Sequence, residues 1–258
     1  MKLFRTIVAS AIVLVAASLV MFLVSFWTGD YLAPAINTIQ FILVLASLIM
    51  SVFLFFKVEK EALSRDIWGI VSISLAIDLV GVSCELVNGY ARSWKVSQDV
   101  VFIIYLFVWL ALLVVPFVLY VKYRHAGFGF SAEAYYAVIP SLVIVSLATV
   151  VLVLVPLARS DLDVGTKISN FVAPIVGLGM LFFLMFLVAT LGKGELGKPW
   201  LFLSLCVASI VIQTIVSTNV MLVLGYMRVL EPANFFLHLG YGFLLIAEAY
   251  QYRITTGA

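Results

Sequence analysis

The feature that most constrains this chain is a series of eight long apolar runs separated by short polar breaks. A run of about 20 apolar residues is long enough to cross about 30 Å of hydrocarbon as a helix. The runs cover residues 5–27, 35–56, 67–90, 99–121, 136–157, 168–191, 199–225 and 233–252. Polar and apolar residues do not alternate within them, which excludes a membrane barrel built from strands. We therefore predict an all-α integral membrane bundle of about eight transmembrane helices.

The composition agrees with this prediction and narrows the class of protein. Of 258 residues, 65% are hydrophobic and only 11% are charged, which are too few polar residues for a water-facing surface. The breaks leave no room for a soluble domain, so residues 1–258 are predicted to form a single transmembrane domain. The net charge of +2 does not favour nucleic acid as a partner, and the expected environment is a lipid bilayer.

The distribution of Lys and Arg predicts the orientation in the membrane. About ten of these residues lie at the N-terminus, in the loops 57–66, 122–135 and 192–198, and at the C-terminus, against about five on the other side. Cytoplasmic loops of membrane proteins carry the excess of Lys and Arg. We therefore expect a multi-pass protein of the cell membrane with both termini in the cytoplasm.

A short motif occurs twice and indicates an internal duplication. Residues 86–92 read LVNGYAR, residues 222–228 read LVLGYMR, and the same offset aligns Tyr105 with Tyr241. We predict two halves, about 1–130 and 131–258, each of four helices. Because four is even, the halves would enter the membrane in the same orientation, related by an axis along the membrane normal. The alternative is two ordinary helix ends, since Gly, Tyr and Arg commonly end a helix at a membrane surface.

Three carboxylates fall inside the apolar runs, namely Asp78, Glu85 and Glu248. An ionised carboxylate costs on the order of 2.5 to 3.5 kcal/mol at the centre of a bilayer, so such residues are candidates for function. Asp78 is about twelve residues from either end of its run and shares one helix face with Ser74 and Glu85. This face is expected to point into the bundle. The alternative is a protonated Asp78 that serves only helix packing.

Other polar residues are expected at a similar depth in the outer half of the membrane. A rise of about 1.5 Å per residue brings His238 to the level of Glu85, and Gln213 to the level of Asp78. If Glu85 and His238 touch, the pair forms a proton-sensitive latch; the alternative is that they face different neighbours. The candidate ligand or proton site from these depths is Asp78, Glu85, His238, Tyr105, Tyr241, Gln213 and Asn219.

Several catalytic and cofactor sites are excluded by counting. The sequence contains no G-x-x-x-x-G-K-[ST], H-E-x-x-H or G-x-S-x-G motif. His125 and His238, its two histidines, are expected on opposite sides of the membrane, which excludes haem held by two histidines. Cys84 and Cys206 lie in different runs and are expected to be inert apolar side chains. We therefore predict no enzymatic activity, no cofactor and no metal.

One region resembles a known family. The residues that carry the resemblance are Gly81, Glu85, Ser97, Asp99 and Tyr105, followed by residues 239–241 (LGY) in the last run. The pattern is similar to the multi-helix sensor modules found at the N-termini of bacterial and archaeal signalling proteins. Those modules precede kinase or cyclase domains, whereas this sequence carries no output domain. The resemblance implies a sensory or binding role in the outer half, with Glu85 and Asp99 at the matching positions.

These observations favour a non-enzymatic membrane protein with an outward-facing polar pocket. It would bind a small ligand or protons and signal to a separate membrane or cytoplasmic protein. Two rival hypotheses stay open. One is an ion-coupled or proton-coupled transporter or channel that uses Asp78 and Glu85 as a relay. The other is a structural subunit of a membrane complex. The sequence also leaves open whether the chain forms a homo-oligomer.

Overall fold

The computed structural model describes residues 2–28, 32–59, 62–90, 96–125, 132–161, 164–191, 194–219 and 230–257. Within these residues the chain is helical throughout and contains no strand, so the all-α prediction is confirmed there. The first four helices are α1 (Lys2–Thr28), α2 (Ala33–Lys57), α3 (Leu63–Tyr90) and α4 (Gln98–His125). A fifth helical segment joins α5 (Ala132–Thr149), a π-helical turn (Val150–Leu154) and α6 (Val155–Arg159). The last elements are α7 (Val164–Leu191), a 3-10 turn (Glu195–Gly197), α8 (Lys198–Asn219) and α9 (Leu230–Thr256).

Six described segments are long and apolar enough to cross a membrane. They are Lys2–Ser25, Pro34–Lys57, Ser64–Tyr90, Val138–Arg159, Phe171–Leu191 and Glu195–Thr218. In α4 the apolar residues Ile103–Val115 lie between positions whose side chains the structure does not describe, so this helix is not among the six. Helix α9 is not among the six because polar residues such as His238, Glu248 and Gln251 interrupt its apolar sequence. The chain is therefore a multi-pass membrane protein in a lipid bilayer.

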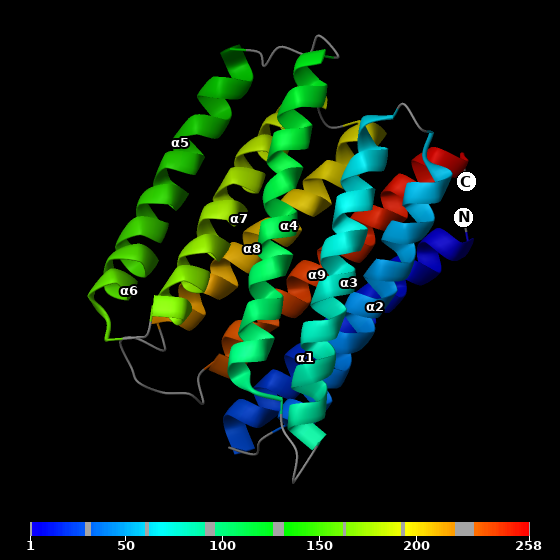
Figure 1. The fold of residues 1–258 in the computed structure, drawn as a ribbon. Helices are drawn as coiled ribbons and strands as arrows, with labels where there is room; N and C mark the ends of the chain where they lie inside the picture. Colours follow the sequence, from blue (N-terminus) through cyan, green and yellow to red (C-terminus); the bar gives the residue numbers. More distant parts are fainter. Residues whose placement is uncertain are drawn as a thin grey trace.

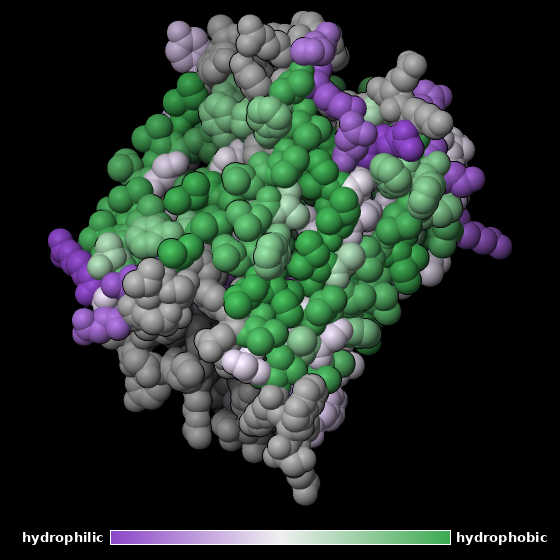
Figure 2. Space-filling view, viewed as in Figure 1, coloured by the Kyte–Doolittle hydropathy of each residue, from purple (hydrophilic) through white to green (hydrophobic). Residues whose placement is uncertain are grey.

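The surface of the bundle agrees with this environment. Figure 2 shows one face on which hydrophobic residues cover the middle of the molecule and hydrophilic residues gather toward its ends. Large apolar side chains such as Ile12, Phe117, Ile144 and Val151 are exposed. A contiguous apolar surface of this extent is typical of contact with lipid rather than with water.

Helix α9 is the packing centre of the bundle. It lies against α8, α1 and α2, while α3 packs between α2 and α4 (Figure 1). Helix α7 packs against α8, α4 and α5, and the α5–α6 segment lies at the edge. Glycines allow two of these approaches: a Cβ at Gly242 would lie 2.5 Å from Val15 Cγ2, and one at Gly177 would lie 2.7 Å from Val211 Cγ2. Small residues let membrane helices approach closely.

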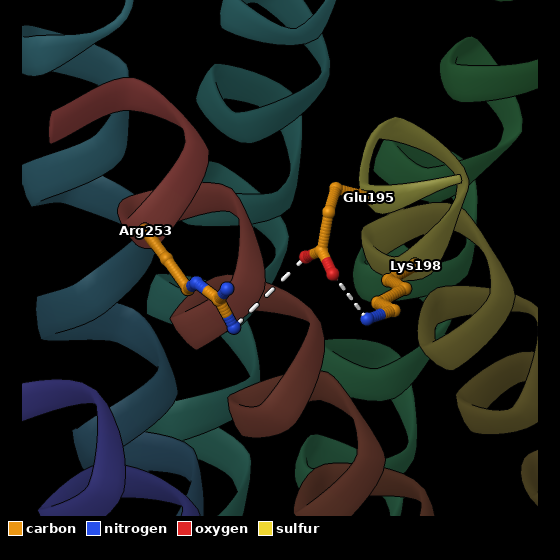
Figure 3. A network of polar contacts seen from close by, with 3 residues as sticks. All are labelled: Glu195, Lys198 and Arg253. Atoms are coloured by element: carbon orange, nitrogen blue, oxygen red, sulfur yellow. Dashed lines mark hydrogen bonds and ion pairs between the residues drawn. The ribbon is translucent and has the colours of Figure 1, made fainter. Parts of the chain in front are cut away.

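The two termini lie together at one end of the bundle (Figure 1). The Phe4 ring contacts the Tyr250 ring with centroids 5.1 Å apart. At this end Glu195 joins Lys198 at 2.5 Å and Arg253 at 4.0 Å, which ties the start of α8 to the end of α9 (Figure 3). The second copy of the repeated motif, residues 222–228, lies outside the described residues, so the motif itself is not compared in space.

Candidate functional site

A cavity of about 310 Å³ lies inside the bundle, lined by side chains of α2, α3, α4, α7, α8 and α9. Its lining on α3 extends from Val71 to Glu85. Helix α3 begins at the end of the bundle that holds the termini, since it follows α2 directly and Phe53 near the end of α2 contacts Tyr252 of α9. The cavity therefore extends from the middle of α3 toward the end of the bundle opposite the termini.

A hydrogen bond between Asp78 and Tyr241 connects α3 with α9 at the cavity. The Tyr241 hydroxyl donates to Asp78 Oδ2, and both side chains are more than nine-tenths buried. Gly240 lies beside Tyr241, and a Cβ there would be 3.2 Å from the carbonyl oxygen of Cys206 on α8. This close approach positions the Tyr241 ring between α3 and α8. A buried carboxyl needs such a donor, because leaving it unsatisfied in a low-dielectric interior is costly.

Glu85 and Tyr105 form the next part of the lining, two helical turns along α3 from Asp78. The Tyr105 hydroxyl oxygen is buried and makes no hydrogen bond of ordinary geometry with the described residues, but the Glu85 carboxyl lies close enough to act as its acceptor. The Glu85 carboxyl also interacts electrostatically with Asp78. Gly81 makes room for the ring, since a Cβ at Gly81 would lie 3.0 Å from Tyr105 Cε1. A hydroxyl and a carboxyl side by side at a cavity are ready hydrogen-bonding groups for a ligand or water.

The opposite wall of the cavity is polar but uncharged. Gln213 Nε2 donates to Asn234 Oδ1 at 3.5 Å, which links α8 with α9. Thr214 and Ser217 also line this wall. Gln213 and Asp78 were expected at one level and line the same cavity, but Gln213 bonds Asn234 whereas Asp78 bonds Tyr241.

The ionisable carboxyl groups of the described lining have no basic residue beside them in it. Asp78 and Glu85 are its acidic residues, and it contains no Lys, Arg or His. Most of the remaining lining is apolar, including Leu75, Trp109 and Met180. A cavity of a few hundred Å³ with apolar walls and a few convergent polar groups is typical of a small-molecule site.

His238 does not belong to this cavity. It is fully buried, its Nδ1 lies 2.6 Å from Ser18 Oγ, and its ring centroid is 5.5 Å from that of Phe22. The imidazole therefore faces α1, whereas Glu85 lines the cavity beside Tyr105. In the contacts that the structure describes, Glu85 and His238 face different neighbours, which is the alternative to the latch. The depth of His238 was inferable from the sequence, but its direction around the axis of α9 was not.

Two further candidates, Asp99 and Asn219, lie in α4 and α8, but their side chains are outside the part of the chain that the structure describes. The remaining five candidates line one cavity: Asp78, Glu85, Tyr105, Tyr241 and Gln213.

Sequence reasoning missed several lining residues. They are Gln40, Trp109, Cys206, Thr214, Ser217 and Asn234. A signal for Trp109 was present, because it stands one helical turn after Tyr105 on α4. Cys206 was expected to be an inert apolar side chain, and its place in the lining was not predicted.

Asn88 continues the polar face of α3 but does not line the cavity. Its Oδ1 accepts a hydrogen bond from the backbone N–H of Val96 at 2.7 Å.

The third buried carboxylate, Glu248, has a different setting. It is fully buried between α9 and α2, and Ser51 Oγ donates to its Oε1 at 2.5 Å. Its Oε2 has no hydrogen-bond partner among the described residues, and neither does the Ser47 hydroxyl one turn away on α2. Glu248 does not line the cavity.

Comparison of the chain with protein-family models, with curated proteins and with solved structures finds no match. The resemblance to sensor modules therefore stays a prediction. The function has to be argued from the cavity and the residues around it.

Proposed function

We propose that this protein is a non-enzymatic membrane receptor that binds a small ligand in the cavity between α3, α4, α7, α8 and α9. The observation that carries the proposal is a hollow at membrane depth whose wall holds two carboxyl groups and a tyrosine hydroxyl, Asp78, Glu85 and Tyr105. Keeping such groups in the membrane is costly, and they are commonly found where a substrate or an ion binds. A purely structural bundle would fill this volume with side chains.

The pattern of helix contacts supports eight spans arranged as two repeated halves. If α1, α2, α3 and α4 correspond to α5–α6, α7, α8 and α9, most neighbouring pairs have a counterpart. The pair α2 and α3 matches α7 and α8, α3 and α4 matches α8 and α9, and α4 with α7 matches α9 with α2. The contact of α1 with α9 has no comparable counterpart between α5 and α4.

The cavity lies where such a symmetry axis would pass. Tyr105 and Tyr241 line the cavity together, and four further pairs of lining residues have the same separation in the sequence. These pairs are Val71 and Val207, Ser74 and Ile210, Asp78 and Thr214, and Val108 and Leu244. A duplicated bundle would place equivalent residues around its axis in this way. Within this proposal, the two halves clasp the ligand and their relative movement reports its presence to a separate partner protein. With cytoplasmic termini, the cavity faces outward.

The experiment uses the native Cys206 thiol as a reporter of the cavity. In a Cys84→Ala variant, reconstituted in lipid vesicles, the neutral reagent methyl methanethiosulfonate should label Cys206. Mass spectrometry of the intact protein measures the label. A Cys84→Ala, Cys206→Ala variant is the control and should stay unlabelled.

Labelling by a charged, membrane-impermeant methanethiosulfonate added outside vesicles whose orientation has been measured supports an outward-facing site. If neither native Cys206 nor a Ser217→Cys reporter in the same lining reacts with the neutral reagent, while detergent-unfolded protein reacts fully, the cavity is sealed and the receptor proposal fails.

One observation favours a second candidate, a proton-coupled transporter. Glu248 lies seven residues beyond Tyr241 on α9, about 10 Å along the helix and toward the end with the termini. It would extend a path of protonatable groups from the cavity through the bundle. Labelling of Cys206 from both sides of the membrane would favour this candidate over the receptor.

A further inference from the structure

We infer that the ligand of the cavity is a small organic cation, one with a compact positive group and an apolar body. This inference rests on the proposed ligand-binding function and specifies its chemistry. It follows from the sign of the charge in the lining, from the position of that charge on one wall, and from the aromatic groups beside it.

The acidic charge of the lining has no described counter-charge. Asp78 and Glu85 stand seven residues apart on α3, so they lie on the same face, two turns from each other. The other elements that line the cavity contribute no Lys, Arg or His to it among the described residues. Two carboxyl groups close enough to interact electrostatically repel each other when ionised. A bound cation would relieve this repulsion and hold both groups in their charged form.

The aromatic side chains next to the acids suit an organic cation rather than a bare metal ion. Tyr105 and Trp109 stand one turn apart on α4 and both line the cavity. Aromatic faces attract ammonium and guanidinium groups, and they supply none of the oxygen ligands that a hard metal ion prefers. The Tyr105 hydroxyl is buried beside the Glu85 carboxyl, and its oxygen can still accept a hydrogen bond from an N–H or O–H group of the ligand.

The opposite wall explains why the ligand should also have an uncharged part. Across the cavity from α3, the positions equivalent in the proposed repeat are neutral, with Thr214 standing where α3 has Asp78. Leu203, Val207 and Met180 add apolar surface. A volume of about 310 Å³ exceeds that of a hydrated metal ion and matches the lower end of small-molecule pockets.

The test compares two reagents of opposite charge at the same thiol. In the Cys84→Ala variant, Cys206 is reacted separately with the positively charged trimethylammonium reagent MTSET and with the negatively charged sulfonate reagent MTSES. The rate with MTSET is divided by the rate with MTSES. This ratio is then divided by the same ratio measured for the free thiol glutathione, which removes the intrinsic difference between the two reagents. We expect this normalised ratio to exceed one by at least about tenfold, because a cleft lined by one sign of charge concentrates counter-ions by factors of about 10 to 1,000.

Variants assign the preference to the two acids. Asp78→Asn with Glu85→Gln should bring the normalised ratio to near one, whereas Asp66→Asn on the same helix should leave it high. Asp66 is paired with Lys122 outside the cavity, which makes it a matched control. Choline should slow the labelling of Cys206, and its uncharged isostere 3,3-dimethylbutan-1-ol should not.

The outcomes separate the two proposals. If neutral methyl methanethiosulfonate labels Cys206 but the charged reagents show no preference, or if the neutral isostere protects as well as choline, the cation inference is overturned and ligand binding stands. If no reagent reaches Cys206 or the Ser217→Cys reporter, the ligand-binding proposal itself fails. A charge preference that persists in the Asp78→Asn, Glu85→Gln variant would also overturn the inference.

Discussion

The acids of the cavity and the acid between α9 and α2 share their chemistry but differ in packing. Asp78 and Glu248 are both more than nine-tenths buried, and each accepts a hydrogen bond from a hydroxyl, of Tyr241 and Ser51 respectively. Asp78 borders a hollow of about 310 Å³, whereas Glu248 does not line it. A buried carboxylate therefore does not by itself mark a binding site in this protein. The empty volume next to it makes the difference.

The largest change in the free energy of unfolding is expected from truncating Glu248, the acid that is packed between α9 and α2. Glu248→Ala removes side-chain packing and leaves the Ser51 hydroxyl without its acceptor, so it should lower the free energy of unfolding by about 2 to 4 kcal/mol. Asp78→Ala should cost less, because it enlarges a hollow that already exists and the Tyr241 hydroxyl that loses its acceptor borders that hollow, where water can replace it. Thermal unfolding in detergent, followed by circular dichroism, measures both. Equal losses would mean that the two acids are packed alike.

The next largest loss of stability is expected at Ser51, whose hydroxyl donates a hydrogen bond to Glu248. Ser51→Ala leaves Glu248 Oε1 without its hydrogen bond and should cost about 1 to 3 kcal/mol. Replacing both partners, as Ser51→Ala with Glu248→Leu, should cost less than the sum of the two single changes, since no buried polar group is then left unsatisfied. A double-mutant cycle on unfolding temperature checks this. Additive losses would show that the hydrogen bond contributes nothing.

A smaller effect is expected where Gly81 faces Tyr105. Ala in a helix interior is favoured over Gly by about 0.8 to 1.0 kcal/mol, and Gly179→Ala inside α7 should show this gain because its Cβ would meet no atom within 4 Å. Gly81→Ala should gain less, since its Cβ would press on the Tyr105 ring at 3.0 Å. The displaced ring should also change the rate at which Cys206 is labelled, while Gly179→Ala should not. Identical behaviour of the two variants would remove Tyr105 from the cavity wall.

The smallest effect is expected at Ser47. Its buried hydroxyl has no described partner, so Ser47→Ala should leave the free energy of unfolding within about 0.5 kcal/mol or raise it slightly. Ser51→Ala, one turn away on the same helix, is the matched comparison. A loss at Ser47 as large as at Ser51 would indicate that both hydroxyls hold the Glu248 carboxyl.

Much of the fold was predictable because hydrophobicity acts along the chain. Each predicted apolar run overlaps a described helical segment, although six segments rather than eight reach the length and hydropathy of a membrane span. The depth of a polar residue follows from counting along its helix. Counting brought Tyr105 and Tyr241 close to the level of Glu85, and the structure places the three in one lining.

The same counting failed wherever the rotation of a helix decided the contact. His238 and Tyr241 are three residues apart on α9, yet His238 faces Ser18 of α1 and Tyr241 faces Asp78 of α3. Counting along α9 places His238 and Tyr241 within about 5 Å of each other in depth. It does not show which neighbouring helix each side chain faces. The order of helices around α9 supplies that information.

The sequence by itself determined that this chain is a helical membrane protein and at what level each costly polar group lies, because the bilayer fixes helix length and penalises charge locally. The tertiary structure alone decided that Asp78, Glu85 and Tyr105 surround a hollow while Glu248 is packed against Ser51. That outcome depends on how the side chains of six different helices fill the space between them. Close packing is a property of the whole arrangement and leaves no local mark in the sequence.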